Sequence, residues 1–241
     1  MKTQIVASFM PDNDQLTQKD LALINQYQDD FDILELRVDG LAHCEIDTLR
    51  KIIEEIKTVL KKDLLVTYRT VKQGGKGVKS EEDYVKFIRG IGRLEQVDLI
   101  DIEWEPYNDI RKILVHECEA HQKVTLLSYH HFDETPKIEV LKKTYFNMSK
   151  LGAQHLKIAV MPQTRQDVLI LLEALSEASE ALPQWVTGIS MSQLGVISRT
   201  AQEVFGGALT YGSISEAVAP GQLHVKTLSN LMPVYSLVEK R

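Results

Sequence analysis

Short strand-like runs alternate with helical patterns along this 241-residue chain, and this alternation constrains the fold more than any other feature. Apolar and β-branched residues gather in eight runs, at 4–9, 33–39, 64–70, 99–105, 123–132, 155–161, 185–192 and 208–214. Apolar residues at helical spacing fill the segments at 16–27, 46–60, 84–91, 110–120, 138–151, 168–182, 194–204 and 222–238. We therefore expect eight βα units of about 30 residues each, which is the size of a βαβ module.

Eight such units without an intervening linker predict a closed (β/α)₈ barrel, the TIM-barrel fold, as a single domain over residues 1–241. A doubly wound open sheet is the alternative, but the first strand is not followed by the glycine-rich loop that binds dinucleotides. Helix-start signals agree with the pattern. The segments that begin at Ser80 and Thr164 resemble capping boxes, and Thr135 precedes a proline as an N-cap would.

The composition is that of an ordinary water-soluble globule, with 44% apolar and 26% charged residues. A net charge of −6 argues against a nucleic acid or an anionic membrane surface as a partner. Cys44 and Cys118 form no metal or redox motif, and the chain starts without an apolar signal segment. No apolar run approaches the roughly 18 residues of a membrane-spanning helix. We therefore expect a cytoplasmic protein.

Polar and charged side chains interrupt five consecutive predicted strands near their C-terminal ends, where the active sites of such barrels lie. Residues two apart on a strand share a face, so each polar pair points one way while aliphatic residues point the other. A barrel interior normally holds branched apolar side chains, and five strands with inward charges therefore indicate a functional site. The residues are Glu35, Arg37, Arg69, Asp101, Glu103, Ser128, His130 and Lys157.

Lys157 lies in the middle of the run at 155–161, on the face opposite three aliphatic side chains. Its head could reach water, it could pair with an acid such as Glu103, or it could form a Schiff base with a carbonyl substrate. Nucleophilic attack needs the neutral amine, and burial beside Arg37 or Arg199 could lower the lysine pKa by the roughly 3 units required. The chemistry alone leaves these interpretations open.

His130 shares the inward face with Ser128 and could take the proton that an iminium on Lys157 would acidify. His131 should point to the other face because neighbouring strand residues alternate. Two adjacent strand histidines cannot bind one metal ion together, so we expect no metal.

The loop at 73–77 lacks the spacing of a Walker phosphate loop and is interpreted as a flexible active-site loop. Taken as bare patterns, Arg199 is a surface arginine a turn or so into a helix, and the segment at 219–222 is a turn.

Six motifs in register along the chain resemble those of the type I 3-dehydroquinate dehydratases, also called 3-dehydroquinases. They are Glu35-Leu-Arg37-Val-Asp39, Tyr68-Arg69-Thr70, Ser128-Tyr-His130-His-Phe132, Lys157-Ile-Ala-Val-Met-Pro162, Ile189-Ser-Met191 through Gly195 to Ser198-Arg199, and Ala219-Pro-Gly-Gln222. The resemblance implies a lyase of the shikimate pathway, which leads to aromatic amino acids. It also implies a homodimer without metal or cofactor that converts 3-dehydroquinate to 3-dehydroshikimate and water.

By matching position, the resemblance implies Lys157 as the Schiff-base lysine and His130 as the general acid and base. Arg199 would hold the substrate carboxylate, a role that suits the guanidinium fork. Further contacts to the ring hydroxyls or the carboxylate would come from Ser8, Glu35, Arg37, Arg69 and Gln222.

Three features depart from the family pattern. Many members carry a glutamate, described as the partner of the catalytic histidine, where this chain has Gln73. A common serine before the Ala-Pro-Gly-Gln motif is replaced by Val218, and the N-terminal hairpin of some members is missing. Without an acid at position 73, we expect Glu103 to partner His130, because it shares the inward face of the neighbouring strand.

Two other functions fit parts of the pattern. A class I aldolase would share Lys157 but would need a phosphate site after strands seven and eight, where this chain offers Arg199 and Gln222. A non-catalytic barrel that binds polyhydroxy acids would not need both Lys157 and His130. Trapping with borohydride would separate that binder from both enzymes.

Overall fold

The computed structural model describes residues 2–235, in which nine strands alternate with eight α-helices. The strands are β1 (Gln4–Phe9), β2 (Ile33–Arg37), β3 (Asp63–Thr67), β4 (Leu99–Glu103), β5 (Val124–His131), β6 (His155–Val160), β7 (Trp185–Ser190), β8 (Leu209–Ser213) and β9 (Leu223–His224). The helices are α1 (Gln18–Tyr27), α2 (Ile46–Lys57), α3 (Glu81–Gly92), α4 (Ile110–Ala120), α5 (Ile138–Ser149), α6 (Arg165–Ala181), α7 (Val196–Thr200) and α8 (Val225–Leu231). All eight predicted strands are present, and β9 is an addition.

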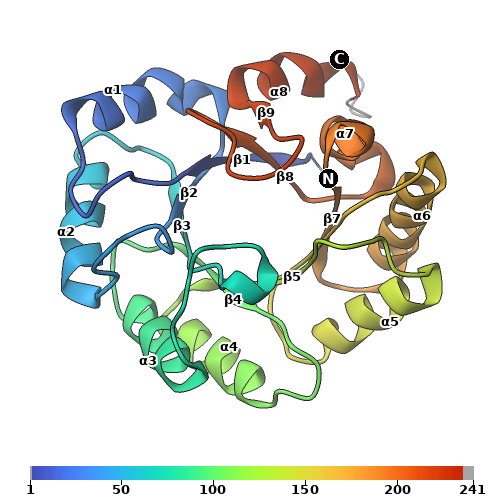
Figure 1. Ribbon diagram of the computed structural model, residues 1–241, viewed down its shortest axis with the longest axis horizontal. Helices are drawn as coiled ribbons and strands as arrows, with labels where there is room; N and C mark the ends of the chain where they lie inside the picture. Colours follow the sequence, from blue (N-terminus) through green and yellow to red (C-terminus); the bar gives the residue numbers. More distant parts are fainter. Residues whose placement is uncertain (1, 236–241) are drawn as a thin grey trace.

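The strands form one parallel sheet in the order β7-β6-β5-β4-β3-β2-β1-β8-β9. Because β8 pairs with β1, the sheet curls round into the ring seen in Figure 1, with the helices outside it. Between β7 and β8 a backbone bond replaces a full ladder: the Ala208 N–H donates to the Val186 carbonyl at 2.7 Å. The Thr187 hydroxyl oxygen accepts from the Leu209 N–H at 3.1 Å. The predicted TIM-barrel fold is confirmed.

Side-chain alternation along the strands divides the interior into two cores. On β2, Leu34 and Leu36 belong to the large core between sheet and helices, whereas Ile33 belongs to a smaller core inside the barrel. On β6, Leu156 and Ile158 likewise face the helices. The residues between them therefore point into the barrel, which is how the sequence period of two places polar side chains there.

Helix boundaries follow local capping chemistry. The Thr164 hydroxyl forms a capping box at the start of α6, and the Ser80 hydroxyl accepts from the third residue of α3. The predicted N-cap at Thr135 is wrong: α5 begins at Ile138, and the Thr135 hydroxyl instead donates to a carbonyl oxygen after β6 at 3.1 Å.

The last two predicted helices are shorter and more broken than expected. The segment at 194–204 divides into a 3₁₀ turn, the five-residue helix α7 and a second 3₁₀ turn. One cause is Ser198, whose hydroxyl bridges the Ser190 N–H and the Gly195 carbonyl and so ties the first turn to β7. The segment at 222–238 becomes β9, α8 and a 3₁₀ turn, and residues from 236 onward lie outside the described part of the chain.

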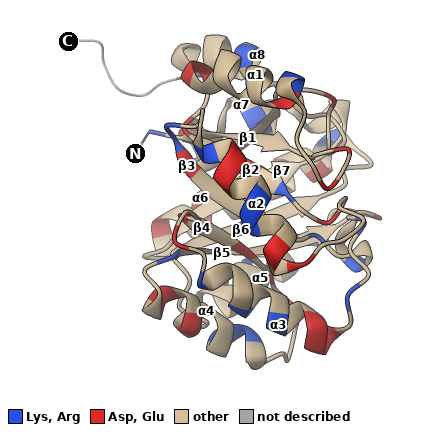
Figure 2. Ribbon diagram, turned by 90° about the vertical axis from the view of Figure 1, so that its left-hand side faces the viewer, with Lys and Arg blue, Asp and Glu red and all other residues tan. Residues whose placement is uncertain are grey.

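Acidic and basic positions are interspersed over the helices on the side of the molecule that Figure 2 turns toward the viewer. Among residues 2–235, no helix is both long enough and apolar enough to cross a membrane.

Candidate active site

The C-terminal ends of the strands surround one pocket with a cavity volume of about 50 Å³. All eight predicted site residues line it, although they come from the four strands β1, β2, β5 and β6, from the turn after β3, from α7 and from the loop after β8. They are Ser8, Glu35, Arg37, Arg69, His130, Lys157, Arg199 and Gln222. The pocket wall also includes Gln73, Gly74, Phe132, Ala159, Ile189, Met191, Tyr211, Val218 and Ala219.

Lys157 is buried in the barrel, with 6% of its surface exposed. Within the described residues its Nζ makes no hydrogen bond or ion pair. The Nζ lies over the face of the Tyr211 ring, 3.6 Å from the ring centroid. Burial lowers the pKa of Lys157 to about 8, with Glu35 opposing the decrease. About a tenth of the molecules therefore carry a neutral amine at pH 7, against fewer than one in a thousand for a lysine in water. The interpretations of a solvated head and of a pair with Glu103 are both wrong.

Glu35 is an anion held deep in the barrel. Its carboxylate accepts hydrogen bonds from the Ser8 hydroxyl at 2.5 Å and the Thr67 hydroxyl at 2.9 Å. Burial alone would raise the pKa of Glu35, but Lys157, Arg37 and these two hydroxyls lower it below its ordinary value. The pocket thus keeps a negative charge near the amine without a direct ion pair.

Arg69 is neutralised by acids of the next strand. It donates to Asp101 at 2.8 Å, to Glu103 at 3.1 Å and to the Ser128 hydroxyl at 2.8 Å. Burial by itself would lower the pKa of Arg69, but the two acids raise it well above its usual value. Arg37 is matched in the same way by a two-bond pair with Asp39 at 2.9 Å.

Arg199 has no acidic partner among residues 2–235, although only 1% of its surface is exposed. Its guanidinium donates to the backbone carbonyls of Tyr211 at 3.4 Å and Pro220 at 2.9 Å, and its Nε has no partner in the described structure. Burial lowers the pKa of Arg199 to about 10. A buried cation with an unused donor is a binding site for an anion, and the planar fork suits a carboxylate.

His130 is held by Gln73, and this contact fixes its tautomer. The Gln73 Oε1 accepts from the His130 backbone N–H at 3.0 Å and lies 3.2 Å from the ring Nδ1, while its Nε2 donates to the Trp104 carbonyl at 3.1 Å. Because Oε1 can only accept, Nδ1 carries the proton and Nε2 is free to act as a base. Burial, together with Arg69 and Lys157, lowers the pKa of His130 well below 6.5, so the ring is neutral at pH 7.

The expected partnership of His130 with Glu103 is wrong. Both carboxylate oxygens of Glu103 are occupied by Arg69, the Thr70 N–H and the Thr70 hydroxyl. His131 points away from the pocket, as alternation predicted: its Nδ1 accepts from the Glu134 N–H at 3.4 Å, and its ring packs against Tyr129.

A model of the type I 3-dehydroquinase family matches residues 14–238. The chain belongs to the type I 3-dehydroquinase family. It is 40% identical over 237 residues to the 3-dehydroquinate dehydratase of Staphylococcus saprophyticus, covering 97% of this chain and 99% of the relative. It is 43% identical over 238 residues to that of Staphylococcus carnosus, covering 98% of each chain. The predictions of this family and of an enzyme, a lyase, are confirmed.

Solved structures of the family share the barrel. The Clostridium difficile type I 3-dehydroquinate dehydratase superposes with a TM-score of 0.88 at 32% identity, covering 97% of this chain and 92% of the other. The Geobacillus kaustophilus 3-dehydroquinate dehydratase gives a TM-score of 0.91 at 26% identity, covering 99% and 93%.

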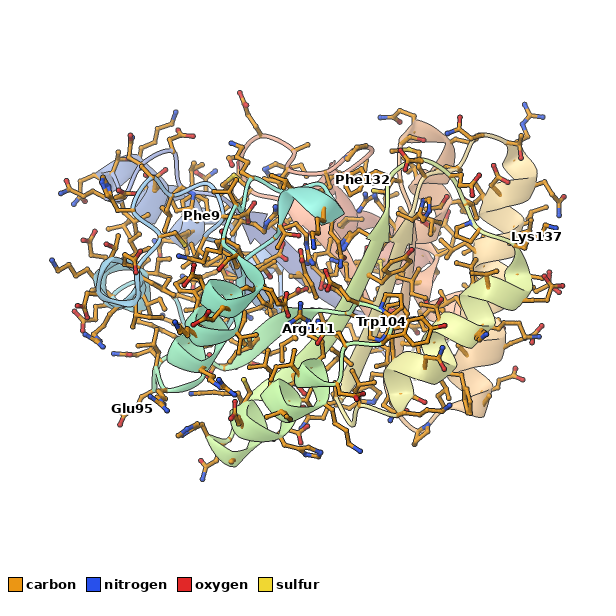
Figure 3. The ribbon with its side chains drawn as sticks, turned by 60° about the horizontal axis from the view of Figure 1, so that its bottom comes forward. Phe9, Glu95, Trp104, Arg111, Phe132 and Lys137 are labelled. Carbon is orange, nitrogen blue, oxygen red and sulfur yellow. The ribbon has the colours of Figure 1, made fainter. Side chains whose placement is uncertain are left out.

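In this member of the 3-dehydroquinase family, the loop after β3, which the sequence suggested to be flexible, packs tightly against the barrel rim. A Cβ on Gly74, whose φ is +81°, would lie 2.1 Å from the Phe132 ring, and one on Gly75 would lie 2.1 Å from the Arg69 carbonyl oxygen. Only glycine allows this approach. Figure 3 shows Phe132 at the rim of the barrel beside this turn, with Glu95 at the opposite end.

The loop after β8 closes over the pocket from the other side. The Pro220 carbonyl accepts from the Ser192 N–H at 3.1 Å. The Gln222 amide donates to the Ser8 hydroxyl at 3.1 Å and accepts from the Val218 N–H at 2.9 Å. Val218, which replaces the common serine, therefore helps to hold Gln222 in place through its backbone N–H.

Two pocket residues were missed or undervalued by sequence reasoning. Tyr211 is on the inward face of β8, and its position in the middle of the run at 208–214 was the available signal. Gln73 was treated as a lost acid, whereas its amide contacts both the backbone and the ring of His130. Among residues 2–235 no three His, Cys, Asp or Glu side chains are grouped to hold a metal ion, and metal independence stays a prediction.

Proposed function

We propose that this chain dehydrates 3-dehydroquinate to 3-dehydroshikimate and water, a step of the shikimate pathway, through a Schiff base on Lys157. The observation that carries the proposal is the buried amine with a pKa of about 8 and no ion-pair partner in the described structure. It lies in one pocket with a neutral histidine and an unmatched arginine. A binding protein would have no use for an amine kept partly neutral.

In the first step the substrate ketone condenses with Lys157. The neutral Nζ attacks the carbonyl carbon, a C–N bond forms, and the carbonyl oxygen leaves as water. The resulting iminium withdraws electrons from the neighbouring carbon and acidifies its C–H bond. His130 is neutral, with Nε2 free, and takes that proton.

In the second step the same histidine acts as an acid. As an imidazolium it protonates the departing hydroxyl, which leaves as water, and hydrolysis of the iminium releases the enone product and the amine. The low pKa of His130 keeps the ring neutral and able to accept the proton in the first transfer, and it makes the imidazolium a strong acid for the second.

The remaining pocket residues bind and orient the substrate. Arg199 holds the carboxylate, since Arg37 and Arg69 already have acidic partners. Glu35, Ser8 and Gln222 form a hydrogen-bonded group that meets the ring hydroxyls, and the arginine side chains add donors. The related Clostridium difficile enzyme, described with a covalently modified comenic acid, supports covalent chemistry in such a pocket.

The test is the appearance of the enone. Purified full-length protein mixed with 3-dehydroquinate should produce an ultraviolet absorbance that grows with time and with enzyme concentration. Lys157→Ala should abolish the increase, and His131→Ala, a histidine outside the pocket, should retain it. A wild-type protein that yields no enone would exclude the proposed activity, and a binder or an aldolase would give that result.

The family resemblance also supports a homodimer in the cytoplasm, and both stay predictions. Sedimentation of the purified protein would distinguish a dimer from a monomer.

A further inference from the structure

Tyr211 supplies an aromatic surface directly against the amine of Lys157. It lies on β8, which only β7 separates from β6 in the ring of strands, and 4% of its surface is exposed. The Nζ of Lys157 lies 3.6 Å from the centroid of its ring. This is well within the roughly 6 Å at which a cation is attracted by an aromatic face.

The attraction comes from the ring and not from an ionised phenol. Burial, with Glu35 and Asp101 nearby, raises the pKa of Tyr211 well above 10, so the hydroxyl keeps its proton. That hydroxyl is buried and has no hydrogen-bond partner among residues 2–235. The part of Tyr211 that meets the amine is therefore the electron-rich ring face.

We propose that the Tyr211 ring binds the positive charge of Nζ, stabilising the ammonium and the iminium over the neutral amine, and that it fixes the direction of the amine. The proposal rests on the proposed function for its iminium stage. From the ammonium, condensation with a ketone replaces the C=O double bond of the substrate with a C=N double bond to Nζ. Two nitrogen protons leave with the oxygen as water, and the single positive charge stays on nitrogen. The ring thus faces a cation before and after the step.

A ring suits this task better than a carboxylate in direct contact. A buried ion pair would hold the lysine as an ammonium, because breaking it leaves two uncompensated charges. The weaker attraction of a ring leaves the neutral amine accessible. The other charged or titratable groups that act on this amine come from β2, β4, β5 and the turn after β3, and neither acid among them forms an ion pair with it within residues 2–235. They are Glu35, Arg37, Arg69, Asp101 and His130.

The first test measures the amine alone, without substrate. The acid dissociation constant of Lys157 is obtained from competitive acetylation across pH, read by peptide mass spectrometry. Tyr211→Leu should raise this constant about 5- to 30-fold, the range expected for a desolvated cation–ring contact. Tyr211→Phe keeps the ring and loses only an unpartnered hydroxyl, so its constant should stay within about twofold of wild type.

A third substitution helps to distinguish the loss of the aromatic ring from a change in packing. Methionine has about the volume of leucine but a longer, more flexible side chain without an aromatic face, so Tyr211→Met should behave as Tyr211→Leu does, with thermal unfolding checked for each protein. A constant that is unchanged in both Leu and Met variants, or equally altered in Tyr211→Phe, would overturn the proposal.

The second test adds 3-dehydroquinate and borohydride. The fraction of Lys157 reduced to a secondary amine at saturating substrate should fall about 5- to 30-fold in Tyr211→Leu and stay near wild type in Tyr211→Phe. Equal trapping in Leu and wild-type proteins would overturn the iminium part. If wild type itself is not trapped, the proposed Schiff base fails, whereas the acetylation result still decides whether the ring binds the ammonium.

Discussion

Replacing Gln73 with glutamate would put a carboxylate against the ring of His130. The Gln73 Oε1 lies 3.2 Å from the ring Nδ1 and accepts the His130 backbone N–H, and a glutamate oxygen can take over both contacts. The second glutamate oxygen would face the Trp104 carbonyl, where the Gln73 amide now donates at 3.1 Å. The substitution therefore adds an attraction for the imidazolium and removes one hydrogen bond.

The attraction is the larger effect. At an effective dielectric constant of about 20, a full charge 3.2 Å from Nδ1 stabilises the imidazolium by about 5 kcal/mol. Leaving the Trp104 carbonyl against an oxygen costs about 1–3 kcal/mol. That cost falls equally on the neutral and the protonated ring, so only the attraction acts on the pKa of His130, which it raises by up to about 4 units.

The pKa of His130 can be followed by NMR of its ring C–H signals during a pH titration. In wild type the ring should stay neutral well below pH 6.5, and in Gln73→Glu its midpoint should move upward into the accessible range. The pH dependence of kcat/KM should change as well. Below the new midpoint it should fall about 100-fold per pH unit, because neutral Lys157 and neutral His130 are both required.

Gln73→Met is the matched control, since it removes the hydrogen bonds without adding charge. It should slow turnover but leave the His130 midpoint low. A midpoint in Gln73→Glu that stays at the wild-type value would refute the direct contact between the side chain at position 73 and the His130 ring.

Three further predictions follow from the pocket and its base. His130→Ala should lower kcat by about 10²–10⁴-fold, whereas His131→Ala should change it less than about threefold; equal losses in steady-state assays would show that the wrong histidine was assigned. Arg199→Gln should lower kcat/KM for 3-dehydroquinate by about 10²-fold or more, mostly through KM, because a buried donor pair for the carboxylate is lost; an unchanged KM would contradict this role. His155 is buried at the base of the barrel with a pKa lowered to about 4, so the unfolded chain binds a proton more readily than the folded one below pH 6.5. Stability should therefore decrease by roughly 2–4 kcal/mol as the pH falls from 6.5 to 4, and His155→Leu should remove most of this decrease in denaturant titrations.

The barrel and the inward face of its strands could be predicted from the sequence because both depend on periodicity. Glu35 and Arg37 are two residues apart and alternate with Leu34 and Leu36. Because the outer face of the sheet is buried against helices, the leucines face outward and the two charged side chains face into the barrel. The same parity placed Lys157 and His130 in a common pocket and turned His131 away from it. Strand ends were predicted a few residues too long, because residues such as Asp39 leave the ladder at the rim while still turned toward the site.

Partner choice within the pocket could not be predicted, because it depends on distances between strands that are far apart in the chain. Glu103 shares the inward face with His130, yet its carboxylate forms an ion pair with Arg69 instead. The sequence pattern alone indicated a surface position for Arg199. In the structure, the bend after β7 buries this side chain, and it has no acidic partner within residues 2–235. The contact between Lys157 and Tyr211 joins residues 54 positions apart in the chain, on strands separated by β7, and no local sequence pattern predicts it.

The central claim is that Lys157 forms a Schiff base with the substrate, and borohydride reduction during turnover tests it most directly. Lys157 is the only lysine that lines the pocket within residues 2–235. Wild-type protein treated with 3-dehydroquinate and borohydride should gain the mass of one reduced adduct. Peptide mapping should place that adduct on Lys157, and Lys157→Ala should gain none. An adduct on Lys76, or enone formation by a protein that cannot be trapped, would contradict the account.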